Sequence, residues 1–390
     1  MSYFEFSNLV KVISGDDALE NLGYELDYFK VKKPLVLSDA MLVKLGTVDI
    51  IKKCNRDYDF STLYTDIPID SSMQEIKKIK DFYISKNCDG ILAVGGGSVI
   101  DTAKMVKLML SQNEDDIKKL MGSERVQRGK EIPFIVIPTT SGTGAEMTSV
   151  AVIKDTENDK KYEFISSELL PNVALLDIRM TMGMPPKLTA STGIDALCHA
   201  VEAYSCNQKN PISDALASVA IEKLYNNIVV ATVDGKDKKA RMEMSEGSLI
   251  AGLSFSNSMV GLVHAIAHSI GGVAKVSHGD AISLMIVPVL EFNKEYARQE
   301  YSKMLMFTLG DEVYAKTKKE ERADAFIGSI KELLERLRAV GALPKNLRDR
   351  GVKDYQLEEI AKLSINDGAI LLNKRKATKE QILELLKSVF

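Results

Sequence analysis

The hydrophobic pattern of the chain changes near residue 185, and this change constrains the fold more than any other feature of the sequence. Up to that point, short β-rich apolar runs alternate with segments of helical periodicity. Because strand and helix alternate, the first half is expected to form a parallel sheet with right-handed crossovers. The predicted strands span residues 34–39, 60–65, 90–94, 133–138 and 173–177.

After residue 185, strand signals nearly disappear and helical patterns predominate. The segment 182–186 contains Gly183 and two prolines, which makes it the natural hinge between the halves. We therefore predict an α/β N-terminal domain over residues 1–184 and an all-α C-terminal domain over residues 185–390. Helices are predicted over residues 190–205, 213–227, 240–255, 262–274, 320–340, 357–364 and 379–390.

All four histidines of the chain fall in the helical half. Asp195 and His199 are four residues apart, as are His264 and His268, so each pair lies on one face of a helix. Their neighbours are apolar, and a buried imidazole or carboxylate needs a partner, which a divalent metal provides for several groups at once. With His278 as a fifth candidate, the pattern predicts one divalent ion held by one carboxylate and three imidazoles.

A single histidine on an apolar helix face is usually a core residue that bonds a neighbour. Two spaced pairs, and the absence of histidine elsewhere in the chain, favour the metal site instead. The spacing alone does not say which three imidazoles bind. Mixed nitrogen and oxygen ligation suits Zn²⁺, Fe²⁺ or Mn²⁺ and does not choose among them.

Two glycine-rich turns follow the predicted strands 90–94 and 133–138. Glycine lets the backbone approach a ligand closely, and the N-terminus of a following helix attracts phosphate. Neither turn has the Gly-x-Gly-x-x-Gly or P-loop spacing, and each could instead be a tight connection, with Ser98 and Asp101 spaced nearly as a capping box. The candidate cofactor-binding residues in the turns are Gly95, Gly96, Gly97, Ser98, Asp101, Thr139, Thr140 and Thr143.

Asp39 stands at the end of the predicted strand 34–39. An acid at this place bonds the adenosine ribose in dinucleotide-binding folds, and its charge would repel a 2′-phosphate. The residue therefore favours NAD over NADP. The alternative is a solvated loop aspartate.

The overall composition limits which binding partners and which cellular compartment are expected. The net charge of −3 provides no general case for binding nucleic acid or an anionic membrane. The four cysteines include no Cys-x-x-Cys pair, which fits a reducing cytoplasm. The N-terminus lacks the blocks of a signal peptide, and no apolar run is expected to reach membrane-spanning length.

Five motifs in order along the chain resemble those of the iron-containing (group III) alcohol dehydrogenases. They are Gly95-Gly96-Gly97-Ser98-x-x-Asp101, Thr139-Thr140-Ser141-Gly142-Thr143-Gly144-x-Glu146, Gly193-x-Asp195-Ala196-x-x-His199-Ala200, Gly261-Leu262-Val263-His264-x-x-x-His268 and His278-Gly279. The resemblance implies a Rossmann-like first domain in the dehydroquinate synthase-like fold. The expected metal is Fe²⁺, with Zn²⁺ or Mn²⁺ as alternatives. We also predict a homodimer in the cytoplasm, with a larger assembly as the alternative to the dimer.

The resemblance also assigns roles to the candidate residues. It implies metal ligation by Asp195, His199, His264 and His278, and leaves His268 beside the nicotinamide and substrate as a candidate for proton relay. It suggests Lys161 as a cofactor contact, against the alternative of a plain surface lysine. Phe255 is similar to a residue of the substrate pocket wall.

The predicted function is a metal-dependent alcohol dehydrogenase or aldehyde reductase that acts on a small or medium alcohol or diol with NAD, NADP being the alternative cofactor. The reaction is alcohol + NAD⁺ = aldehyde + NADH + H⁺. A lyase resembling dehydroquinate synthase is the second interpretation, but it needs a basic pocket for a phosphorylated substrate, whereas the histidines here have apolar neighbours. A non-catalytic scaffold with structural histidines is the third.

Overall fold

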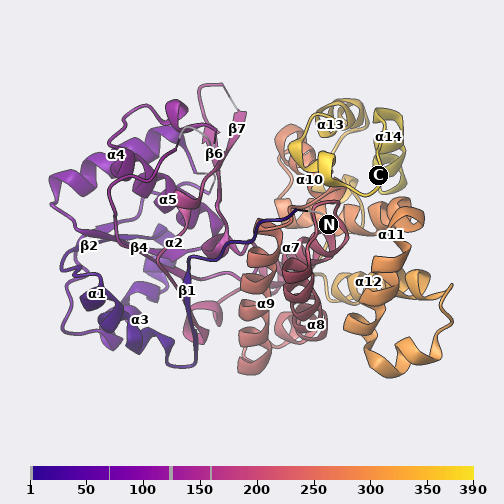
Figure 1. The fold of residues 1–390 in the computed structure, drawn as a ribbon, viewed down its shortest axis with the longest axis horizontal. Coiled ribbons are helices and arrows are strands. Elements are labelled where there is room, and N and C mark those ends of the chain that lie inside the picture. The colour runs from indigo at the N-terminus through magenta and orange to yellow at the C-terminus, as the bar shows by residue number, and fades with distance from the viewer. Residues whose placement is uncertain (1–2, 70, 123–125, 159) are drawn as a thin grey trace. The chain divides into compact units, whose positions relative to one another are not determined.

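The computed structural model describes residues 3–69, 71–122, 126–158 and 160–390, which form two compact units (Figure 1). An α/β unit spans Asn8–Gly183, and a helical unit spans Met184–Phe390 together with residues 3–7. Ser7 belongs to the helical unit because its N–H donates to Asn257 Oδ1 at 2.8 Å and its carbonyl accepts from Asn257 Nδ2 at 3.2 Å. The predicted fold class is confirmed.

In the described part of the α/β unit, six parallel strands form one sheet in the order β1-β8-β5-β4-β2-β3. Four of the strands, β2, β4, β5 and β8, are buried at every position, as expected for parallel strands that are covered on both faces. The strands are β1 (Lys11–Gly15), β2 (Pro34–Leu37), β3 (Leu63–Tyr64), β4 (Gly90–Gly95), β5 (Phe134–Pro138) and β8 (Val173–Asp177).

Helices cover both faces of this sheet (Figure 1). Helices α4 (Met73–Ser85) and α5 (Gly97–Gln112) pack on the face that includes Leu35 and Ile91. Helices α1 (Leu22–Tyr28) and α3 (Thr47–Cys54) pack on the opposite face, which includes Val36 and Leu92. Neighbouring residues of one strand therefore pack into two separate hydrophobic cores, because successive side chains along a strand point to opposite faces of the sheet.

Three shorter features complete the α/β unit. Helix α2 (Ala40–Lys44) follows β2, and helix α6 (Ile178–Thr181) follows β8. Strands β6 (Val150–Asp155) and β7 (Lys160–Ile165) form an antiparallel hairpin. The hairpin packs on the core that α4 and α5 share, because Ala151, Ile153 and Phe164 are buried in it.

The helical unit has a single large hydrophobic core to which each of its α-helices contributes. In Figure 1 this unit runs from magenta through orange to yellow. Its helices are α7 (Pro186–Ser205), α8 (Pro211–Val233), α9 (Lys238–Ser256), α10 (Leu262–Ala274), α11 (His278–Lys316), α12 (Arg322–Ala339), α13 (Leu357–Ser364) and α14 (Lys379–Ser388).

The structure contains elements that the sequence did not predict, and helix α11 is the longest of these. Pro288 lies inside α11, and Ala297 and Gly310 depart from helical dihedral angles, so its sequence carries signals that usually end a helix. Strand β1 and the β6–β7 hairpin were missed because most residues of β1 and β7 are not buried. The strand predicted over residues 60–65 was too long, since β3 covers only Leu63–Tyr64.

Helix α8 is long and apolar enough, by length and composition alone, to cross a membrane, contrary to the expectation from the sequence. Its buried side chains, among them Ala217, Ile221, Leu224 and Ile228, belong to the core of the helical unit. That packing accounts for part of the apolar composition of the helix, while Val219, Val230 and Val233 are exposed.

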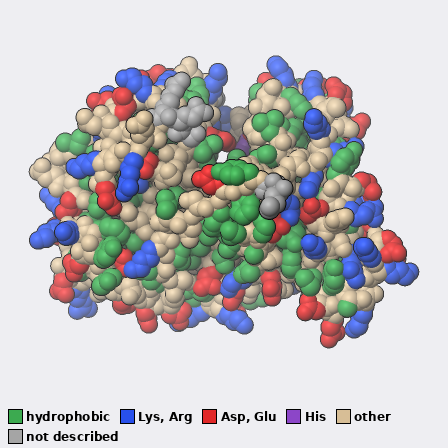
Figure 2. Space-filling view, viewed as in Figure 1, with side chains coloured by type: hydrophobic (Ala, Val, Ile, Leu, Met, Phe, Trp, Pro, Cys, Tyr) green, Lys and Arg blue, Asp and Glu red, His purple; other side chains and the backbone are tan. Residues whose placement is uncertain are grey.

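Charged side chains of both signs alternate over the face of the molecule drawn in Figure 2. No broad area of a single sign stands out on that face. This distribution agrees with the small net charge of −3.

Candidate metal centre

Helix α7 carries three functional side chains on one face. Asp195, His199 and Glu202 stand at positions i, i+4 and i+7, which bring them to the same side of a helix. The helix begins at Pro186, where the missing N–H of proline does no harm, and nearly all of it from Gly193 onward is buried. The rigid, buried helix therefore fixes a carboxylate and an imidazole one turn apart.

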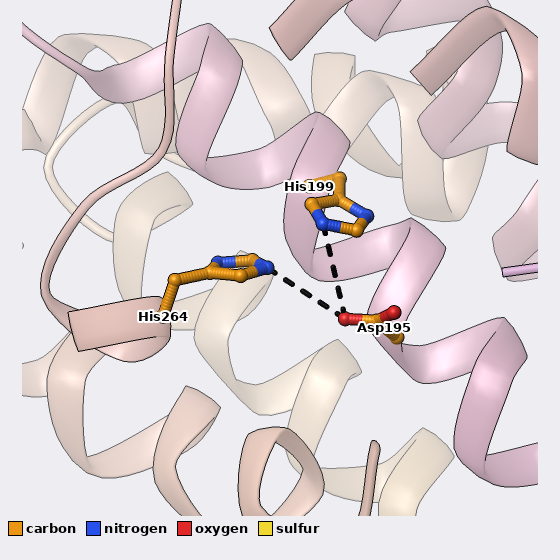
Figure 3. A group of neighbouring side chains, drawn as sticks. All are labelled: Asp195, His199 and His264. Atoms are coloured by element: carbon orange, nitrogen blue, oxygen red, sulfur yellow. Dashed lines mark ion pairs between the residues drawn. The ribbon is translucent and has the colours of Figure 1, made fainter. Parts of the chain in front are cut away.

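Two further helices bring imidazoles to the same carboxylate, and Figure 3 shows one of these, His264, with Asp195 and His199. Asp195 Oδ1 lies 3.6 Å from His264 Nε2 on α10 and 3.3 Å from His278 Nε2 at the start of α11. His199 Nε2, on the same helix as Asp195, lies 3.9 Å from that oxygen. One carboxylate oxygen is thus faced by three imidazole nitrogens, the arrangement that the histidine spacing predicted.

Two glycines permit the close packing of these helices. A Cβ atom on Gly279 would lie 2.4 Å from the carbonyl oxygen of Ser191 on α7. A Cβ atom on Gly193 would lie 2.7 Å from Ile228 Cδ1 of α8. Glycine next to His278 therefore lets α11 begin directly against α7, where His278 reaches Asp195.

Polar atoms at this site are buried without a hydrogen-bond partner. Among the described residues, Asp195 Oδ1, His264 Nε2 and His199 Nδ1 are in this state. A buried polar atom without a partner is costly, and a cation bound between the carboxylate and the imidazoles would satisfy Asp195 Oδ1 and His264 Nε2 together. The residues present therefore fit a divalent metal of the kind that nitrogen and oxygen ligands bind.

The protonation of the site also suits a cation. Burial lowers the pKa of His199 to about 3, so its imidazole is neutral, as a metal ligand must be. Burial alone would raise the pKa of Asp195, but the imidazoles of His199 and His278 hold it well below its usual range. The carboxylate is therefore ionised, and because burial also lowers the pKa of His278, His199 and His278 face it as neutral donors. Burial opposes protonation of His264 too, but its contacts with Asp195, Cys198 and Glu202 hold its pKa well above its usual range, so a metal would displace a proton there.

His268 lies beside this group but has a partner of its own. Its Nδ1 is 2.9 Å from Asp367 Oδ2, a residue 99 positions away in the chain. Asp367 Oδ1 in turn accepts from the N–H of Ala369 at 2.9 Å, which caps a short 3₁₀ helix. The ring of His268 stacks on that of His278 with centroids 5.3 Å apart.

A small apolar cluster adjoins the histidines. Phe255 stacks on His199 with ring centroids 4.3 Å apart. Phe255 and Ile370 also pack against Val260 and Ala369. The surroundings of the site are thus apolar on this side.

Sequence analysis missed two residues that contact the histidines. Glu202 Oε2 lies 2.6 Å from His264 Nδ1, and Asp367 contacts His268. Glu202 had a usable signal, because it continues the helical stripe of Asp195 and His199. Asp367 had none, because its partner is remote in the sequence.

In the α/β unit, the structure brings the two glycine-rich turns side by side. They follow β4 and β5, which are neighbouring parallel strands with Gly95 opposite Pro138. A Cβ atom on Gly96 would lie 3.2 Å from the Thr140 side chain, and one on Gly97 would lie 3.0 Å from that of Thr143. Glycines at these two positions allow the turns to approach this closely.

The side chains near the first turn are largely engaged within the protein. Helix α5 begins with Gly96 as its N-cap residue, so Ser98 and Asp101 do not form the capping box that their spacing allowed. The Ser98 hydroxyl donates to the carbonyl of Ile69. Asp101 Oδ2 accepts from the N–H of Val152 at 3.0 Å, which ties α5 to the β6–β7 hairpin.

The remaining candidates for cofactor binding lie elsewhere in the α/β unit. Asp39 follows β2 and caps α2, with Oδ1 accepting from the N–H of Leu42 at 2.9 Å. Since β2 pairs with β4, Asp39 lies at the same edge of the sheet as the first glycine turn. Lys161 is exposed on β7, opposite Lys154 in the hairpin.

Comparison with known protein families decides the identity of the fold. The model of the iron-containing alcohol dehydrogenases matches residues 10–178, and the model of the C-terminal domain of the Fe-containing alcohol dehydrogenase family matches residues 189–390. The chain belongs to the iron-containing alcohol dehydrogenase family. It is therefore an oxidoreductase of the iron-type alcohol dehydrogenase class, as its motifs predicted.

Individual iron-containing alcohol dehydrogenases are similar over the whole chain. The 1,3-propanediol dehydrogenase of Citrobacter freundii is 31% identical over 100% of both chains. The NAD-dependent methanol dehydrogenase of Bacillus methanolicus is 31% identical over 96% of this chain and 97% of its own. A solved structure of a 1,3-propanediol oxidoreductase superposes with a TM-score of 0.93 at 28% identity, covering 100% of both chains.

Proposed function

We propose that the protein interconverts a small or medium primary alcohol, or a diol, with the corresponding aldehyde, using NAD and one divalent metal ion. The observation that carries the proposal is the meeting of three imidazole nitrogens at Asp195 Oδ1. The range of relatives, whose names include methanol and 1,3-propanediol, supports a small alcohol as substrate.

The residues that would hold the metal are Asp195, His199, His264 and His278. We expect Fe²⁺, with Zn²⁺ or Mn²⁺ as alternatives, because the donor set suits all three. When bound, the ion supplies Lewis acidity to the substrate oxygen, and the nicotinamide supplies or accepts the hydride. The buried helices keep the four side chains in place and exclude bulk water from Asp195.

His268 is the group proposed to move the substrate proton. Its Nδ1 is engaged by Asp367, so Nε2 is the ring atom that is left to exchange a proton. The stacking of its ring on His278 supports this role, because it holds the imidazole next to the proposed ligands. Phe255 and Ile370 would form an apolar wall for the carbon chain of the substrate.

The α/β unit is proposed to bind the dinucleotide. The glycine turns after β4 and β5 and the N-terminus of α5 support a pyrophosphate site at the carboxyl edge of the sheet. We propose Gly95, Gly96, Gly97, Thr139, Thr140 and Thr143 as its main elements, with Ser98, Asp101 and Lys161 as further candidates. Asp39 at the same edge supports NAD over NADP.

We further propose a cytoplasmic homodimer. Cys54, Cys88, Cys198 and Cys206 all carry free thiols, which supports a reducing compartment. The partner molecules proposed are the alcohol or aldehyde alone, without nucleic acid or membrane.

The test is metal analysis of freshly purified anaerobic protein, followed by a panel of aldehydes with NADH and with NADPH. We expect one metal per chain and oxidation of NADH by short aldehydes. Protein with one metal per chain that converts no aldehyde or alcohol would contradict the proposal. Turnover of a phosphorylated substrate without net change in NADH would favour the lyase instead.

A further inference from the structure

One buried carboxylate, that of Glu202 on α7, binds the start of helix α10. Glu202 Oε2 accepts from the N–H of Gly261 at 3.0 Å, and Oε1 accepts from the N–H of Val263 at 2.8 Å. Oε2 also lies 2.6 Å from His264 Nδ1. Only 6% of Glu202 is exposed, so water has little access to its oxygens. These three groups are therefore the partners that its carboxylate depends on.

The same carboxylate therefore joins a helix terminus to an imidazole. The first N–H groups of a helix have no partner within the helix, and a negative charge is favoured there. Gly261, the N-cap residue of α10, has no side chain to serve them. A Cβ atom at this position would lie 3.0 Å from Glu202 Oε1, so glycine also leaves the carboxylate the room that it occupies.

His264 lies between two carboxylates. Its Nδ1 faces Glu202 at 2.6 Å, and its Nε2 faces Asp195 Oδ1 at 3.6 Å. A carboxylate can only accept, so Nδ1 donates its hydrogen to Glu202, and Nε2 is the nitrogen that would bind a metal held beside Asp195. The bond at one ring nitrogen sets which tautomer the other presents to a metal.

Cys198, Glu202 and His264 also lie close enough to one another to be ligands of a second ion. Two backbone N–H groups already point at the Glu202 oxygens, however, and the imidazole of His264 already faces one of them. Donors of hydrogen bonds occupy the space that such an ion would need. Glu202 is therefore a hydrogen-bond acceptor for His264.

We propose that Glu202 is a positioning residue of the metal centre, which fixes the tautomer and the ring orientation of His264 and thereby raises the affinity for the metal. The inference rests on the proposed metal site. A partner of this kind typically changes metal affinity about 10- to 100-fold when it is mutated.

A role in capping α10 alone would predict a different behaviour, and the chain offers a matched control. Asn373 Oδ1 accepts from the N–H of Leu262 at 3.3 Å, so it serves the same helix terminus. Its amide also pairs with Asn293 in both directions, at 2.8 and 2.9 Å, and donates to the carbonyl of Arg375 at 2.7 Å. Loss of Asn373 removes a cap of α10 without removing the acceptor of His264 Nδ1.

The experiment compares metal-free wild type, Glu202→Gln and Asn373→Ala. Each is titrated with Zn²⁺ alone against a chromogenic chelator, and the melting temperature of each metal-free protein is recorded. We expect Glu202→Gln to bind Zn²⁺ about 10- to 100-fold more weakly, and Asn373→Ala to lose melting temperature while its Zn²⁺ affinity stays within about twofold of wild type. Equal affinities of Glu202→Gln and wild type, or an equal loss of affinity in both variants, would overturn the inference.

Failure of the metal site itself would look different. If wild type does not bind Zn²⁺ at one ion per chain, the proposed function fails before the variants are compared. If Glu202→Gln does not fold, ¹⁵N spectra of histidine-labelled, Zn²⁺-loaded wild type decide the question, because the chain has only four histidines. We expect His264 to carry hydrogen on Nδ1, and a Zn²⁺-bound or hydrogen-free Nδ1 would refute the inference.

Discussion

The backbone at Gly279 lies directly against the carbonyl oxygen of Ser191, and a Cβ atom at Gly279 would be 2.4 Å from that oxygen. This contact joins the start of α11 to α7. It places His278 Nε2 3.3 Å from Asp195 Oδ1.

Gly279→Ala is therefore expected to move α11 away from α7. Forcing atoms into a packed site typically costs about 1–3 kcal/mol, and the displaced His278 should also weaken metal binding. The measurements are the unfolding midpoint and the metal content after dialysis. Gly272→Ala in α10 is the control, since a Cβ atom there meets nothing within 4 Å. If both variants behave alike, the contact has no role in the site.

Glu146, in the second glycine turn, gives a prediction about pH. Burial raises its pKa to about 7 from an ordinary value of 4.5. The folded protein thus holds this proton more tightly than the unfolded chain, so stability falls as pH rises between about 4.5 and 7. Glutamine at this position does not titrate, so the stability of Glu146→Gln should not fall in this pH range. The free energy of unfolding of the variant, relative to that of wild type, should therefore be about 3 kcal/mol higher at pH 8 than at pH 4.5.

Urea unfolding at the two pH values measures this difference. Glu163→Gln on the exposed side of β7 serves as the control and should change nothing. A Glu146→Gln variant whose stability follows the wild-type pH dependence would show that Glu146 has the same pKa in the folded protein as in the unfolded chain.

Lys104 of α5 is fully buried and holds the segment after the second glycine turn. Its Nζ donates to Thr148 Oγ1 at 2.8 Å and to the carbonyl of Val150 at 2.6 Å, and lies 3.6 Å from Asp101 Oδ1. Lys104→Met would leave these acceptors buried without their donor. Breaking such an arrangement typically costs about 3–5 kcal/mol.

Chemical unfolding should show a lower free energy of unfolding for Lys104→Met than for wild type. Fluorescence titration should also show that the variant binds NADH more weakly. Lys119→Met removes a mostly exposed lysine that pairs with Glu114 at 3.4 Å, and should cost less than about 1 kcal/mol. Normal NADH affinity in a stably folded Lys104→Met would separate this lysine from the cofactor site.

Asp39→Gly should relax the preference for NADH over NADPH. The substitution removes the negative charge at the end of β2 that would repel a 2′-phosphate. Glycine replaces aspartate as N-cap of α2 at a cost of only a few tenths of a kcal/mol, so the fold is retained. The ratio of kcat/KM for the two cofactors is the measurement, and an unchanged ratio would refute the role of Asp39.

The sequence predicted the parts of this protein that follow local rules. The i, i+4 pairs at Asp195 and His264 and the apolar runs of β4 and β5 carry their own periodicity, and the family motifs separated His268 from His264. Helix α11 was hidden by Pro288, which tertiary packing tolerates. The link between His268 and Asp367 depends on a contact across 99 residues, which no local pattern encodes.

Asp101 shows what a sequence motif cannot predict about the role of a residue. Its place in a glycine-rich motif predicts a cofactor contact, and in the structure its carboxylate also accepts from the N–H of Val152 and lies 3.6 Å from Lys104 Nζ. A residue that holds a binding turn and a residue that touches the ligand can stand at the same place in a motif. Only the direction of the side chain separates the two roles.

The most direct test of the metal site is anomalous diffraction from crystals of the metal-loaded protein, collected on both sides of the absorption edge of the metal. The account predicts a single peak at about 2.0–2.2 Å from one oxygen of Asp195 and from a nitrogen each of His199, His264 and His278. A peak bound by His268 in place of one of these histidines, or no peak beside Asp195, would contradict it.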